Sequence, residues 1–226
     1  MKNILVLIKQ YKINVIFYLF GFIVLGFAVN IMKASTLGNG AWDTVTINIR
    51  DFLNINLGFS WVTLGMISFI VSMIIMLIVI LYRRNAKFLF MLLPIFLVAL
   101  SIDFWNFVVF QEREALMFGF QLMFYILGSL LLPLGLTLIV KSNFPAFVFD
   151  ELMLMFVNIF KAKKITYVRL IIEFSGIAIG LIFGYLTYYN VDGTFGAVDI
   201  GSFVLAFTLS PIMAFYFKLL KVQRKN

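Results

Sequence analysis

Six long apolar stretches dominate the pattern of hydrophobic and polar positions along the chain. They fall at about 13–32, 60–82, 88–110, 118–140, 167–189 and 198–217. None shows the alternation of a half-buried strand, and each is long enough for a helix to cross a hydrocarbon core about 30 Å thick. A helix satisfies its own backbone hydrogen bonds in lipid. The pattern therefore predicts an all-α polytopic membrane protein with about six transmembrane helices.

Two further segments are too short or too interrupted to cross a bilayer, and we predict a short helix in each. In residues 36–55, the break Gly38-Asn39-Gly40 precedes apolar positions at helical spacing. In residues 142–160, Pro145 suits the first turn of a helix. The sequence leaves two interpretations open: amphipathic helices lying flat in the interface, or half-helices that enter the bundle.

The two halves of the chain resemble each other when the sequence is shifted by 107 residues. The shift places Tyr18 on Tyr125, Gly21 on Gly128, Leu25 on Leu132, Ser35 on Ser142, Trp42 on Phe149 and Asp43 on Asp150. Each half, 13–110 and 118–220, contains a span, a broken short helix and two further spans. Because three spans is an odd number, the second half would enter the membrane inverted. Residues 1–226 are thus predicted to form one membrane domain with a 3+3 inverted repeat, an arrangement typical of secondary carriers.

Composition agrees with a membrane protein. Of 226 residues, 63% are hydrophobic and 12% are charged, with a mean hydropathy of +1.07. Soluble domains carry about 25% charged residues, so a soluble fold is excluded. The chain has no cysteine and no histidine, which removes disulfides, thiolate nucleophiles, imidazole bases and the usual zinc ligands. We expect no cofactor and no metal.

The net charge is +8, and the basic residues flank the apolar stretches. This placement argues for membrane orientation and against nucleic-acid binding. If the N-terminus is cytoplasmic, 14 basic residues fall on the cytoplasmic side: Lys2, Lys9, Lys12, Arg83, Arg84, Lys87, Lys141, Lys161, Lys163, Lys164, Lys218, Lys221, Arg224 and Lys225. Only Lys33, Arg50 and Arg113 fall on the outer side of the membrane, and Arg169 lies just within a span. Both termini are therefore predicted to be cytoplasmic.

Ionisable residues inside a bilayer cost several kcal/mol unless paired or hydrated, so each is a candidate for function. Asp103 either binds a proton, cation or polar solute, or acts structurally by capping or pairing. Asp43 and Asp150 either face a shared cavity or stabilise their own helix starts. Glu173 lies four residues after Arg169, so the two share a helix face and form an ion pair or part of a site. Asn39 and Asn143 lie at the two breaks, where helix starts can hold an anion or an acidic group.

Catalysis is not expected. A serine protease of the rhomboid kind needs a histidine base, which the chain lacks. The Gly-x-Gly-Asp signature of aspartyl intramembrane proteases is missing, because Ala41 and Trp42 separate Gly40 from Asp43. The sequence also contains no nucleotide P-loop.

The stretch Ala34-Ser-Thr-Leu-Gly-Asn-Gly-Ala-Trp-Asp43-Thr, with Leu57-Gly58 and Gly65 after it, resembles the YczE-like group of bacterial membrane proteins, related to the YitT-like group. The resemblance covers most of the chain and implies a multi-pass protein of the bacterial cell membrane. Ala41 stands where the group usually has proline. Gly201-Ser202 keeps a version of a Gly-Thr pair, which the first half replaces with Phe90-Met91.

The sequence supports a small secondary carrier or permease of unknown solute, coupled to protons through one or more of the acids. The alternative is a membrane scaffold or regulatory partner that docks proteins through basic cytoplasmic loops. Besides the bilayer and a small-molecule solute, no partner is implied, and the oligomeric state is left open.

Overall fold

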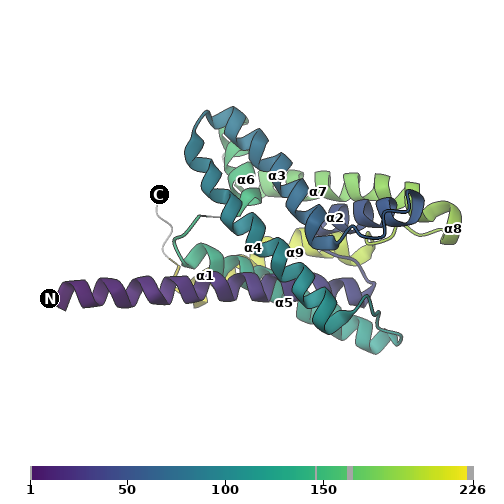
Figure 1. The fold of residues 1–226 in the computed structure, drawn as a ribbon, viewed down its shortest axis with the longest axis horizontal. Coiled ribbons are helices and arrows are strands. Elements are labelled where there is room, and N and C mark those ends of the chain that lie inside the picture. The colour runs from purple at the N-terminus through teal and green to yellow at the C-terminus, as the bar shows by residue number, and fades with distance from the viewer. Residues whose placement is uncertain (1, 146, 162–164, 223–226) are drawn as a thin grey trace.

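The computed structural model describes residues 2–145, 147–161 and 165–222, with side chains from Tyr11 onward except that of Ile165. Within these ranges the chain is helical between short loops and has no strand (Figure 1). Helices α1 to α5 are Lys2–Ser35, Ala41–Asp51, Leu64–Arg83, Leu92–Trp105 and Phe118–Lys141. Helices α6 to α9 are Val148–Ile159, Ile165–Gly184, Asn190–Asp192 and Ile200–Leu219. Short stretches of tighter or wider helix extend them at Phe52–Asn56, Ala86–Met91, Asn106–Phe110 and Tyr185–Tyr189.

Six of the described helical segments are long and apolar enough to cross a membrane. They are Tyr11–Ser35, Leu64–Arg83, Ala86–Phe110, Phe118–Lys141, Thr166–Asp192 and Ile200–Leu219. The predicted spans are confirmed to within a few residues. The largest difference at a span start, Leu64 instead of residue 60, arises because the Thr63 side chain caps α3 by accepting the Met66 N–H. Lys163, Lys164, Arg224 and Lys225 of the charge prediction lie outside the described residues.

Helices α1 and α5 form an antiparallel pair, with α4 packed on α1 and α9 packed on α5 (Figure 1). Glycines allow the close approach. A Cβ atom added at Gly21 would lie 2.8 Å from Ile139 and 3.0 Å from the Gly135 carbonyl oxygen. One added at Gly128 would lie 2.1 Å from Met32 and 3.2 Å from the Ala28 carbonyl oxygen. Small residues at a helix contact serve the same purpose in many membrane proteins.

These glycine contacts are reciprocal. The 107-residue shift that maps Gly21 onto Gly128 also maps Met32 onto Ile139 and Ala28 onto Gly135. The remaining packing follows the same rule, since α2 packs on α7 whereas α6 packs on α3, and α4 packs on α1 whereas α9 packs on α5. Each short helix therefore contacts a long helix of the other half.

The ends of α1 and α5 have the same local structure. The Ser35 hydroxyl donates to the Met32 carbonyl oxygen and accepts the Leu37 N–H. Ser142, 107 residues later, donates to the Ile139 carbonyl oxygen and accepts the Phe144 N–H. The following residues, Thr36 and Asn143, both adopt positive φ, at 60° and 58°.

Helix α2 lies within the bundle. A Cβ atom on Gly176 would lie 3.1 Å from the Ala41 backbone, and one on Gly180 would lie 2.6 Å from the Thr44 hydroxyl oxygen. Since Gly176 is near the middle of the span Thr166–Asp192, α2 begins level with the middle of α7 and runs toward α8. The fully buried Asn48 fixes it there by donating to the Gly180 and Phe195 carbonyl oxygens.

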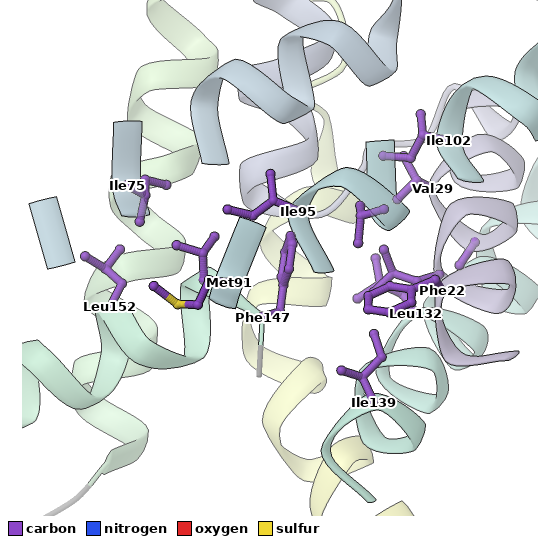
Figure 2. Close-up of a cluster of buried hydrophobic side chains, with 14 of the residues drawn as sticks. Phe22, Val29, Ile75, Met91, Ile95, Ile102, Leu132, Ile139, Phe147 and Leu152 are labelled. Carbon is purple, nitrogen blue, oxygen red and sulfur yellow. The ribbon is translucent and has the colours of Figure 1, made fainter. Parts of the chain in front are cut away.

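Figure 2 shows part of the largest buried apolar cluster, which spans both halves. Side chains of the α1–α5 pair lie on one side, and side chains of α3 and α6 lie on the other, with Met91 and Ile95 near them. Many large apolar side chains on the long helices point outward; Leu81, for example, is 75% exposed. An apolar core inside and an apolar surface outside are what a multi-pass membrane protein requires.

Candidate functional site

A cavity of about 90 Å³ lies where the starts of α2 and α6 meet. Gly40, Ala41 and Asp43 line it from α2, and Phe147 and Asp150 line it from α6. Further lining comes from Leu25 and Leu132, which lie near the middles of α1 and α5, and from Leu136, Ile172 and Leu209. We call this space the central cavity. Its volume suits a few water molecules or a small ion.

The two short helices present equivalent residues to the central cavity. Asp43 and Asp150 are each the third residue of their helix, and Trp42 and Phe149 are each the second. The rings of Trp42 and Phe149 contact each other with centroids 4.8 Å apart. Residues paired by the 107-residue shift are therefore in direct contact. A carboxylate in the first turn also interacts favourably with the helix dipole, so each aspartate stabilises its own helix start.

Helix α7 adds an ion pair to the same cavity. Arg169 and Glu173 both line it, and the Arg169 Nε atom lies 3.8 Å from the Glu173 Oε1 atom. The pairing expected from their four-residue spacing is confirmed. The central cavity thus contains three carboxyl groups and one guanidinium among mostly apolar side chains.

This combination can hold and release protons. Burial raises the pKa of Asp43, which lies outside the six spanning helices, to about 7, and the charge of Glu173 adds to the rise. One arginine lines the cavity beside three carboxyl groups. Protonation of some of these groups, or a bound cation, would lower the negative charge in this apolar enclosure. The Trp42 Nε1 atom is buried and, within the described chain, donates no hydrogen bond. It offers a donor beside the carboxyl groups.

Asp103 lies away from the central cavity. Its Oδ2 atom accepts the Thr63 hydroxyl at 2.7 Å and its Oδ1 atom accepts the Gly65 N–H at 2.7 Å. Both contacts hold the first turn of α3 against α4. This is the structural role considered for Asp103, a cap on a neighbouring helix.

The two asparagines occupy different surroundings. Asn39 is 2% exposed, and its N–H donates to the Ser202 hydroxyl at 3.0 Å. Asn143 is exposed at the opposite end of the bundle, and its side chain donates to the Lys141 carbonyl oxygen at 3.3 Å. Neither lines the central cavity, although Asn39 is one residue from Gly40, which does.

We call the end of the bundle at which α8 lies the α8 end. A polar network near this end was not predicted from the sequence. Glu112 accepts hydrogen bonds from Arg50 at 2.7 Å and from Asn106 at 2.7 Å, and it also pairs with Lys33. Arg50 pairs with Asp51 as well, and Asp51 accepts the Tyr188 hydroxyl at 2.7 Å. Desolvation opposes ionisation of Glu112, but the hydrogen bond and charge of Lys33, with Arg50 and Asn106, outweigh it and lower its pKa to about 2. Of this network, only the pairing of Arg50 with Asp51 joins residues that are adjacent in the sequence.

Comparison with known proteins gives a family but no activity. A family model described as "Family of unknown function (DUF6198)" matches residues 12–218, nearly the whole chain. No curated protein and no solved structure matches the chain.

Proposed function

We propose that this chain, which belongs to the DUF6198 family of unknown function, is a secondary carrier that moves a small solute together with protons. The observation that carries the proposal is the central cavity, where two helix starts from different halves bring Asp43 and Asp150 beside Arg169 and Glu173. Interrupted helices that meet near mid-membrane around polar groups are typical of carriers. As a carrier the protein performs no chemical conversion.

The proposal includes the 3+3 inverted repeat, with halves 13–110 and 118–220. The reciprocal contacts of Gly21 and Gly128 support it, because a two-fold relation between equivalent surfaces produces such exchanged contacts. The matching turns after Ser35 and Ser142 support it too. In this scheme α2 and α6 enter the bundle from opposite faces, and each moves against the long helix of the other half to open the cavity to one side. The closer kinship with the YczE-like and YitT-like groups remains part of the proposal.

The charge distribution supports cytoplasmic termini, which places the α8 end outside. The bacterial cell membrane, implied by the resemblance to the YczE-like group, is part of the proposal. Solute entering from the outside would reach the central cavity by passing the loop at Asn39. A proton on a central carboxyl group would balance charge while the cavity is closed to water, because an unbalanced buried charge is costly.

The proposal is tested with the full chain purified and reconstituted in liposomes containing a trapped pH-sensitive dye. A panel of small amines, amino acids, organic acids and sugars is added outside, and the internal pH is followed. We expect at least one solute to drive proton movement that protein-free liposomes do not show, and to raise the melting temperature of the purified protein. If no solute in the panel does either, the carrier proposal is wrong.

A further inference from the structure

A second and larger cavity, about 490 Å³, opens at the α8 end. It lies between the loop before α2, the last turns of α2, the loop that contains Glu112 and Glu114, and the loop 193–199. We call it the vestibule. Gly38 and Asn39 line the vestibule, whereas the next two residues, Gly40 and Ala41, line the central cavity. One short loop therefore separates the two spaces.

The vestibule carries surplus negative charge. Five carboxylates and two basic groups line it. The basic groups, Lys33 and Arg50, are paired with Glu112 and Asp51. The remaining carboxylates belong to Glu114, Asp192 and Asp199. Asp192 accepts hydrogen bonds from Thr194, and Asp199 accepts the Ile200 N–H. Within the described residues, none of these three forms a salt bridge.

Asn39 provides an observation independent of the charges. It is 2% exposed and lines the vestibule, and its Oδ1 atom is buried and accepts no hydrogen bond from the described chain. Buried acceptors are nearly always satisfied in folded proteins, so an acceptor left open beside a cavity calls for a donor from a ligand or water. The aromatic rings of Tyr188 and Phe195 also line the space, and such rings attract cations.

We infer that the vestibule is a binding site for a small organic cation with N–H donors, a primary ammonium or guanidinium compound. The surplus carboxylates attract the charge, the aromatic rings accept the cation on their faces, and Asn39 accepts an N–H at the loop that leads to the central cavity. The volume lies in the range of small-molecule sites, about 300–1,000 Å³. As the entrance for the transported solute, the vestibule rests on the proposed function; as a binding site, it does not.

The chain has no native cysteine, so one introduced thiol reports on the vestibule without background. In Thr194→Cys, the thiol replaces an exposed hydroxyl on the vestibule wall. Reaction rates are measured at low salt on the full chain in liposomes with two methanethiosulfonate reagents, a trimethylammonium and a sulfonate. The control is Ser60→Cys, an exposed position that does not line the vestibule. We expect the ratio of the cationic to the anionic reaction rate to be roughly tenfold higher at Thr194→Cys than at this control. Adding Glu114→Gln and Asp199→Asn should remove most of that preference.

Competition identifies the ligand class. We expect agmatine and 1,4-diaminobutane at millimolar concentration to slow labelling at Thr194→Cys and not at Ser60→Cys, and succinate to leave both unchanged. Equal cationic-to-anionic rate ratios at the two positions, or no protection by either amine, would overturn the inference. Protection without any solute-driven proton movement would overturn the carrier proposal and support the binding site, so the two failures are distinguishable.

Discussion

Replacing Asp43 and Asp150 together by asparagine will reduce solute-driven proton movement to the level of protein-free liposomes. The two carboxyl groups line the central cavity from opposite short helices, and asparagine keeps their shape but carries no titratable proton. Because a carboxylate in the first helical turn contributes only about 0.3–1 kcal/mol, each substitution should leave the protein folded. The single variant Asp43→Asn should also flatten the pH dependence of transport near pH 7, since burial raises the pKa of Asp43 to about 7.

The matched control is Glu151→Gln, which alters the next residue of α6, a carboxyl group that does not line the central cavity. This variant should transport at the wild-type rate. Melting temperatures from tryptophan fluorescence show whether each variant is folded. Wild-type proton movement in the double variant, or an equal loss in Glu151→Gln, would contradict the assigned roles of the two aspartates.

Replacing Gly21 or Gly128 by leucine will push α1 and α5 apart and destabilise the protein. Each side chain would occupy space now filled by the partner helix, where even a Cβ atom would lie 2.8 Å from Ile139 or 2.1 Å from Met32. Overpacking of this kind costs about 1–3 kcal/mol per site. We expect the melting temperature to fall by roughly 2–12 °C, since 1 kcal/mol corresponds to about 2–4 °C in a chain of this size.

The control for this pair is Gly119→Leu, on the same helix α5 as Gly128, where an added Cβ atom meets no other atom within 4 Å. It should leave the melting temperature nearly unchanged. Because the contacts of Gly21 and Gly128 are reciprocal, their two substitutions should have similar costs. A large loss at Gly119, or a loss at only one of the other two glycines, would argue against the two-fold relation between α1 and α5.

The spans and the short helices could be predicted because their signals are local. Apolar runs of sufficient length determine the spans, and the break Gly38-Asn39-Gly40 directly precedes α2. The placement of Pro145 in the first turn of the second short helix was wrong, because α6 begins at Val148 after the N-cap Phe147. The link between Asp43 and Asp150 came from the 107-residue shift, which pairs positions far apart in the sequence.

The depth of the short helices could not be predicted from their own residues. A polar and apolar pattern such as that of α2 suits an interfacial helix as well as a buried one. What places α2 inside is the surface of another helix, where Gly176, Gly180 and Gly184 recur at every fourth position of α7. Glycine is common in membrane helices, so this spacing does not identify its partner.

The polar network around Glu112 at the α8 end could not be predicted either. Glu112 follows a span within an exposed loop, and 62 residues separate it from Arg50, with which it pairs. No periodicity links a loop residue to the end of a distant short helix. The sequence left the role of Asp103 open between binding and structure for a similar reason. Its hydrogen bonds with Thr63 and Gly65 depend on how α4 crosses α3.

The proposed arrangement requires α2 and α6 to enter the bundle from opposite faces and to meet at the central cavity. The most direct measurement is cross-linking of Trp42→Cys with Phe149→Cys in the otherwise cysteine-free chain in lipid, using a short bifunctional thiol reagent and peptide mass spectrometry. Because the two native rings are 4.8 Å apart, we predict an efficient cross-link within one chain. If both thiols are labelled singly but no cross-link forms, as for helices lying flat on opposite faces of a core about 30 Å thick, the account is wrong.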